Sequence, residues 1–225
     1  MNTQSRQQQQ KRQKYVNAGT IWAFWEGNPP DLILLRCIET ARSNNKTRPV
    51  VIVSKATLPL FLDESDYPTF DGQPGGPDSF SAVQYLADWV RTVLLEKYVG
   101  VWFDASVICT STVESWISDD PDKITMFPMH ANPNIHGNWT MASPKPGHPL
   151  LKAWRAEFAR VLNEVGPRCV PTEFCQRAFV EYPALDDVWH HPSPPPLPYL
   201  WVYLVLQLVL QNEPELRSTI CWRSS

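Results

Sequence analysis

The chain has 225 residues, of which 43% are hydrophobic and 19% charged, and its formal net charge is −3. This size and composition suit a single α/β domain with a sizeable core. A slightly acidic chain is a poor match for a nucleic-acid partner, which would favour a basic face.

The first 18 residues are polar, Gln-rich and basic, and they hold no apolar run of the kind found in a secretory signal. We interpret them as a disordered tail and expect a cytoplasmic protein. The domain is expected over residues 19–212. Residues 213–225 are expected to form a short C-terminal tail.

The opening of the domain has the pattern of a strand–helix–strand unit. Residues 20–25, TIWAFW, are β-branched and aromatic and predict a strand. Residues 32–43 carry apolar side chains at helical spacing behind Asp31, a favourable N-cap. Residues 50–54, VVIVS, are typical of a strand that is buried on both faces. Such a unit builds a parallel sheet with right-handed crossovers.

The middle of the chain contains the clearest helix, over residues 79–98, where apolar side chains recur with a period of 3.6. A strand with a polar interruption is predicted to follow it over residues 101–109. Residues 68–77, PTFDGQPGGP, predict a flexible loop and a candidate lid. The other expected elements are strands 124–129 and 138–143, helices 148–164 and 199–211, and a proline-rich linker, 192–198.

The most apolar stretch, LPYLWVYLVLQLVL, covers residues 197–210. These 14 residues are too few for a bilayer span, which needs about 20. We therefore interpret the stretch as a buried helix. Contact with a membrane surface, as a peripheral protein, is the alternative.

The five cysteines match no zinc module and favour a reducing compartment. Cys37 and Cys109 lie in apolar periodic segments and are expected to be buried free thiols. A disulfide between two of the other three stays open; these are Cys169, Cys175 and Cys221.

Three charged residues around the predicted helix 79–98 and the strand after it are the strongest candidates for chemistry. Asp88 and Arg91 are three residues apart and share a helix face. Asp104 lies in an apolar strand, and Ser106, two residues on, is expected to point to the same side. A carboxylate at the carboxyl edge of a parallel sheet lies where ligands usually bind, and a divalent metal on a diphosphate needs such an oxygen ligand. The alternative is that Asp104 only pairs with Arg91 or caps a neighbouring element.

Four segments together resemble one family. They are IWAFWEGNPPDLILLRCIETARSNN, ADWVRTVLLEKYVGVWFDAS, GNWTMASPKPGHPLLKAW and PYLWVYLVLQ. Their order and spacing are similar to those of capsular polysaccharide synthesis proteins and of the wider DXD-sugar-binding, α-mannosyltransferase-like glycosyltransferases. The resemblance covers residues 21–211. It implies a GT-A-like three-layer α/β/α sandwich with a mostly parallel central sheet, in a single domain.

The resemblance also implies an activity, namely metal-assisted transfer of a hexose from a nucleotide-diphosphate sugar to a carbohydrate acceptor, with retention. Mn²⁺ or Mg²⁺ would be the cofactor. Asp104 and Arg91 would be the catalytic residues, and Asp104 with Ser106 would hold the metal. The donor-binding residues it implies are Trp25, Gly27, Asp88, Arg91, Asp104 and Ser106.

The chain departs from the family pattern at three places. Ser106 stands where the DXD motif has its second Asp, which favours the capsular branch and a weaker metal ligand. Val99 stands before Gly100 where relatives have two glycines, so we expect φ at Val99 to be negative. Relatives tend to run beyond Ser225. These departures leave an alternative function open, that of a shortened, catalytically inactive carbohydrate-binding relative.

Weaker candidates lie around the last predicted strand, residues 138–143. His130, His136 and His148 flank a segment that contains Asn138 and Trp139. Such side chains could bind a metal, a donor phosphate or an acceptor hydroxyl. We expect a solvated loop without a ligand.

Overall fold

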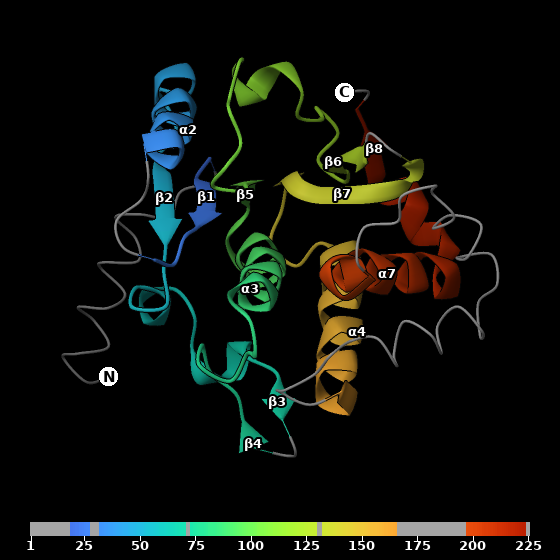
Figure 1. Cartoon of the computed structure of the whole chain (residues 1–225). Helices are drawn as coiled ribbons and strands as arrows, with labels where there is room; N and C mark the ends of the chain where they lie inside the picture. Colours follow the sequence, from blue (N-terminus) through green and yellow to red (C-terminus); the bar gives the residue numbers. More distant parts are fainter. Residues whose placement is uncertain (1–18, 28–31, 71–72, 130–131, 166–196, 224–225) are drawn as a thin grey trace, which may run out of the picture.

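The computed structural model describes residues 19–27, 32–70, 73–129, 132–165 and 197–223 (Figure 1). Its elements, in which η marks short 3₁₀ helices, are β1 (Ile21–Phe24), α2 (Leu32–Asn44), β2 (Val50–Val53), η1 (Leu58–Leu60), η2 (Glu64–Asp66), β3 (Thr69–Phe70), β4 (Gln73–Pro74), α3 (Val83–Tyr98), β5 (Gly100–Phe103), η3 (Val113–Ser115), β6 (Ile124–Met129), β7 (Asn132–Ser143), α4 (Pro149–Val165), α7 (Leu197–Asn212), η4 (Pro214–Thr219) and β8 (Ile220–Trp222).

A six-stranded sheet of order β2-β1-β5-β7-β6-β8 forms the centre of the domain. β1 pairs in parallel with β2 and β5, and β6 pairs in parallel with β8. Only β7 runs antiparallel to its neighbours, β5 and β6. The prediction of a mostly parallel sheet is therefore confirmed. The antiparallel strand β7 lies next to β5, and the candidate acidic motif directly follows β5.

Helices cover both faces of this sheet. Figure 1 shows α2 on one face and α3, α4 and α7 on the other. Successive residues of β1 alternate accordingly, since Trp22 packs in the core under α3 whereas Ile21 packs in the smaller core with Ala41 of α2. The three-layer α/β/α single domain predicted from the sequence is confirmed.

The apolar helix α7 lies in the larger core, as predicted. Its residues from Trp201 to Leu210 are buried with the exception of Tyr203, which is partly exposed. Its Trp201 ring meets Phe158 of α4 edge to face, with the ring centroids 4.8 Å apart. A helix that is apolar on all sides is expected in such a position. Within the described part of the chain, no helix has the length and apolar character needed to cross a membrane.

The strand predicted over residues 101–109 is shorter than expected. β5 ends at Phe103, and the Val107 amide donates to the Asp104 carbonyl at 2.9 Å in a turn. Ser106 therefore does not follow Asp104 along a strand, and the expectation that both point to one side because strand side chains alternate is wrong. Cys37 and Cys109 are buried free thiols, as predicted, and Cys221 is also free.

Two segments are more ordered than the sequence suggested. The expected lid over residues 68–77 contains the antiparallel pair β3–β4. The residues expected as a C-terminal tail include η4 and β8, and β8 extends the sheet beside β6. The candidate linker 192–198 lies mostly outside the described residues, as do Cys169 and Cys175.

The connection from α3 to β5 has an unusual backbone. Val99 has φ 67° and ψ 171°, so the expectation of a negative φ is wrong. Gly100 has φ 110°, and a Cβ there would lie 2.2 Å from the Thr20 carbonyl oxygen. The close approach of β1 thus requires glycine at position 100. Val99 adopts a conformation that is almost confined to glycine.

Candidate functional site

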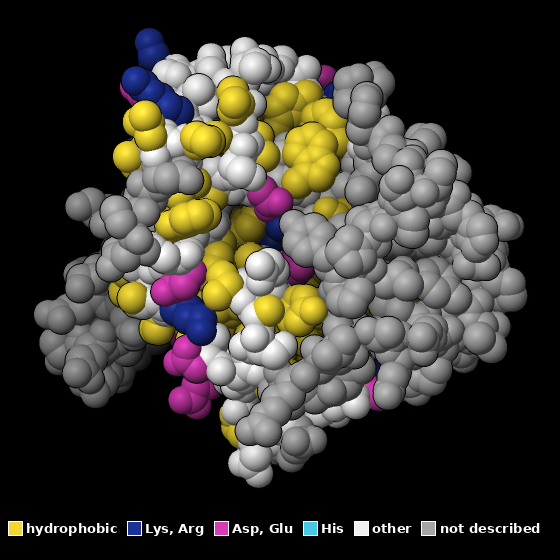
Figure 2. Space-filling model, viewed as in Figure 1, with side chains coloured by type: hydrophobic (Ala, Val, Ile, Leu, Met, Phe, Trp, Pro, Cys, Tyr) yellow, Lys and Arg dark blue, Asp and Glu magenta, His cyan; other side chains and the backbone are white. Residues whose placement is uncertain are grey.

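The candidate site lies at the carboxyl ends of the parallel strands β1, β2 and β5. The register pairs Trp22 with Trp102, which places Phe24 level with Asp104 on the neighbouring strand. Ligands of open α/β domains usually bind at this edge. Figure 2 shows acidic and basic side chains next to one another in a central hollow, with hydrophobic side chains around them.

Arg91 of α3 joins the two candidate carboxylates. Its Nη2 donates to Asp104 Oδ1 at 2.5 Å, and its Nη1 lies 3.0 Å from Asp88 Oδ1. The guanidinium also lies over the Trp102 ring, 5.1 Å from its centroid. The structure therefore brings together three of the six predicted donor-site residues. Arg91 and Asp104 are 13 residues apart in the chain, and the α3–β5 turn brings them into contact.

Burial differs sharply within this cluster. The Arg91 side chain is 4% exposed, that of Asp88 12% and that of Asp104 34%. The pKa of Asp88 is raised to about 7, chiefly by burial. The Arg91 charge and the Asn138 amide oppose this shift, and the nearby Asp104 charge adds to it. Near neutral pH the cluster thus carries no net positive charge, because the guanidinium is already balanced by carboxylate.

Described side chains hold Asp104 by one of its two carboxylate oxygens. Oδ1 accepts both side-chain hydrogen bonds that described residues give, from Arg91 and from Trp102 Nε1 at 2.8 Å. The Asp104 amide donates to the Trp139 carbonyl at 2.8 Å. These contacts fix the orientation of the carboxylate, and Oδ2 accepts no side-chain hydrogen bond from the described residues.

A bulge in β7 completes the site, and no local sequence pattern predicted it. Met126 pairs with Met141 and Phe127 pairs with Gly137, so residues 138–140 have no partner on β6. Asn138 in this bulge donates from Nδ2 to Asp88 Oδ1 at 3.2 Å. The segment expected as a solvated loop therefore contributes a buried amide to the cluster. His148 lies at the start of α4, where its Nε2 is 3.1 Å from the Asp122 carbonyl oxygen.

Side chains of α2 hold the chain that follows Asp104. Cys37 Sγ lies 3.4 Å from the Ser106 carbonyl oxygen, and Asn44 donates to the Cys109 carbonyl at 2.8 Å. Asn45 accepts from the Val113 amide at 2.8 Å. Ser106 itself is exposed. The acidic turn is thus fixed by its backbone, while the Ser106 side chain is open to solvent.

The fit of the site to a divalent cation depends on Asp104. The described residues contain no group of three or more His, Cys, Asp or Glu side chains placed to hold a metal. Mg²⁺ is often bound through one or two carboxylates together with substrate phosphates. Asp104 Oδ2 fits this second arrangement, in which the phosphates of a ligand complete the coordination.

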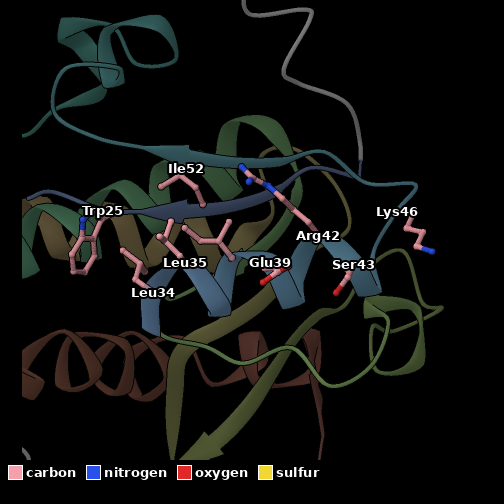
Figure 3. A pocket seen from close by; sticks show the side chains of 9 residues that line it. Trp25, Leu34, Leu35, Glu39, Arg42, Ser43, Lys46 and Ile52 are labelled. Carbon is pink, nitrogen blue, oxygen red and sulfur yellow. The ribbon is translucent and has the colours of Figure 1, made fainter. Parts of the chain in front are cut away.

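Trp25 lies on the other side of the sheet from the acidic cluster. It lines a hollow of about 570 Å³ between α2 and the edge strand β2, together with Leu34, Leu35 and Ile52 (Figure 3). The Trp25 Nε1 atom is buried and has no hydrogen-bond partner among the described residues. Gly27 is exposed, with φ 135°. Trp25 and Gly27 thus lie at the predicted edge of the sheet, and among the described residues no hydrogen bond or ion pair joins them to Arg91 or either carboxylate.

Comparison with models of protein families confirms the family that the sequence resembles. The model of the family described as capsular polysaccharide synthesis protein matches residues 1–164, so the chain belongs to this family. Among solved structures, a chain titled PaToxG Glycosyltransferase matches with 14% sequence identity and a TM-score of 0.46. The match covers 92% of this chain and 83% of that one. No curated protein matches the chain.

Proposed function

We propose that the protein is a hexosyltransferase that uses a nucleotide-diphosphate sugar and a carbohydrate acceptor. The observation that supports this most is the Arg91 guanidinium, which is buried between Asp88 and Asp104 at the carboxyl edge of the sheet. Such a buried ion cluster is costly to form, and a partly exposed carboxylate within it is suited to ligand binding. The family supports the same reaction class.

In this proposal Asp104 contacts the donor, and Asp88 with Asn138 orders the hydroxyls of the donor ribose or hexose. The nucleoside extends toward Trp25, where the apolar hollow beside α2 suits a flat base. Arg91 acts as a positioning residue, because its charge is already balanced within the cluster and its side chain is buried.

A cation on the donor diphosphate follows from the same charge balance. The cluster offers no net positive charge to a leaving diphosphate, so Mn²⁺ or Mg²⁺ would supply charge stabilisation there. Asp104 Oδ2 would hold the metal, and Ser106 would contribute directly or through water. Transfer with retention of the anomeric configuration remains part of the proposal through the family resemblance.

Thermal unfolding with a panel of UDP- and GDP-sugars, each with and without Mn²⁺, tests this proposal. A donor at a concentration of about 100 times its Kd stabilises the folded state by about 2.7 kcal/mol. For a chain of this size the midpoint would rise by about 5–10 °C. No shift with any donor would contradict the proposal.

A second function, glycan binding without catalysis, is motivated by Ser106 at the third position of the acidic motif. A carboxylate is a stronger ligand for a hard cation than a hydroxyl group. Calorimetry that detects glycan binding but no donor binding would favour this second function over the transferase.

A further inference from the structure

Trp139 lies beside the donor cluster but contributes no side chain to it. Its carbonyl accepts the Asp104 amide at 2.8 Å, and its neighbour Asn138 reaches Asp88. The Trp139 side chain takes the other direction, toward aromatic residues on the α2 face of the sheet. It is partly exposed, in contrast to Trp102, which is 1% exposed.

A row of aromatic rings holds the Trp139 indole in place. It stacks on Phe127, with centroids 5.5 Å apart and planes 29° apart. Phe127 meets Trp116 at 5.3 Å, and Trp116 lies 6.2 Å from Phe103 of β5. The row begins in the buried core at Phe103 and ends at the partly exposed indole. One face of the indole therefore packs on Phe127, which is itself held by the rest of the row.

Gly137 makes this position of the indole possible. A Cβ at position 137 would lie 2.6 Å from Trp139 Nε1 and 3.0 Å from the Phe127 carbonyl oxygen. Any other residue would force the indole or the bulge to move. The β7 bulge and Gly137 together fix one flat, partly exposed ring within one residue of Asn138.

We propose that the Trp139 indole is the platform of an acceptor subsite that binds the apolar face of a hexopyranose. This inference rests on the proposed function. β7 and β1 lie on opposite sides of β5, and neighbouring strands are about 4.8 Å apart. A donor whose nucleoside extends from Asp104 toward Trp25 would place its sugar on the β7 side, where Asn138 precedes Trp139. A second sugar on Trp139 would meet the donor sugar across the sheet edge.

The competing interpretation is that Trp139 only packs against Phe127. An apolar side chain of similar bulk would then replace it without loss of binding. Stacking on a sugar requires a flat ring, because the C–H groups of one pyranose face contact the π surface. Trp139→Phe and Trp139→Leu therefore separate the two interpretations, since only phenylalanine keeps a flat ring.

Saturation-transfer-difference NMR with methyl glucoside, methyl galactoside and methyl mannoside tests the platform without a donor. Wild-type protein should give signals concentrated on the protons of one pyranose face for at least one glycoside. Trp139→Leu is expected to raise the Kd about tenfold, equivalent to about 1.4 kcal/mol. Trp139→Phe is expected to raise the Kd by a smaller factor. Trp222→Ala, which removes a 40% exposed tryptophan on β8, is the matched control and should bind as wild type.

Equal affinity of wild type and Trp139→Leu, or no signal from any glycoside with wild type, would overturn the platform. Displacement of the glycoside by the hexose of a nucleotide sugar, but not by the nucleoside diphosphate alone, would assign the ring to the donor sugar and overturn the acceptor assignment. Failure of the proposed function is distinct, because it appears as absence of donor binding in the thermal assay.

Discussion

The backbone strain at Val99 predicts that glycine and alanine substitutions do not follow their usual order of stability at this position. Val99 has φ 67° and ψ 171°, a region that costs a non-glycine residue about 1–3 kcal/mol. The residue is also buried, and its carbonyl accepts the Trp22 indole N–H at 3.1 Å. Strain and burial therefore oppose each other at this position.

Val99→Ala and Val99→Gly separate the two effects. Both variants lose apolar burial, but only glycine removes the strain. At an ordinary position, alanine is more stable than glycine by about 0.5–1 kcal/mol. At position 99 we expect the glycine variant to be at least as stable as the alanine variant.

Val101 supplies the matched control, since it is buried in β5 two residues later and pairs regularly with β1 and β7. Urea unfolding of Val101→Ala and Val101→Gly should show glycine less stable by about 1 kcal/mol or more. The difference in free energy of unfolding between the alanine and glycine variants should thus differ between the two positions by about 1–3 kcal/mol. An equal difference at both positions would refute the strained conformation.

Three further perturbations test the site and the fold. Gly100→Ala is expected to destabilise by more than about 2 kcal/mol, because its Cβ would collide with the Thr20 carbonyl; a wild-type denaturation midpoint would contradict this packing. In the folded protein the pKa of Asp88 is raised to about 7. Between about pH 4 and 7 the folded state therefore binds up to one more proton than the unfolded state. The free energy of unfolding should fall as pH rises through this window, by at most about 1.4 kcal/mol per pH unit. Asp88→Asn should remove this loss, and a variant with the wild-type pH dependence would exclude Asp88 as its source. Arg91→Met is expected to cost about 2 kcal/mol or more, since it leaves two carboxylates facing each other without a cation; an unchanged free energy of unfolding would show that the ion cluster does not form.

The sequence predicted the architecture well because the strands and helices carry strong periodic patterns. The period of α3 and the apolar runs of β1 and β2 indicated the parallel half of the sheet. The sequence also allowed Asp104 to pair with Arg91, and the structure shows this pair. The pair uses Oδ1, so the proposed ligand contact is at Oδ2.

The missed features are those in which tertiary contacts override local pattern. Phe103 to Cys109 has the composition of a strand, but the backbone turns at Asp104 because α2 captures the following carbonyls. The bulge at Asn138 depends on pairing with β6, and no local signal marks it. The positive φ at Gly100 accompanies the close approach of Thr20, a residue 80 positions away, and the positive φ at Val99 directly precedes it.

The most direct test of the central claim is the release of nucleoside diphosphate from the nucleotide sugar that binds best, with Mn²⁺ and without acceptor. Asp104→Asn keeps the size of the side chain but removes the charge, and Asp119→Asn changes an exposed aspartate on the loop between β5 and β6 as a control. We predict that Asp104→Asn lowers the rate about 100-fold, while Asp119→Asn hydrolyses the donor as wild type does. Hydrolysis by Asp104→Asn at the wild-type rate would contradict the assignment of the donor site.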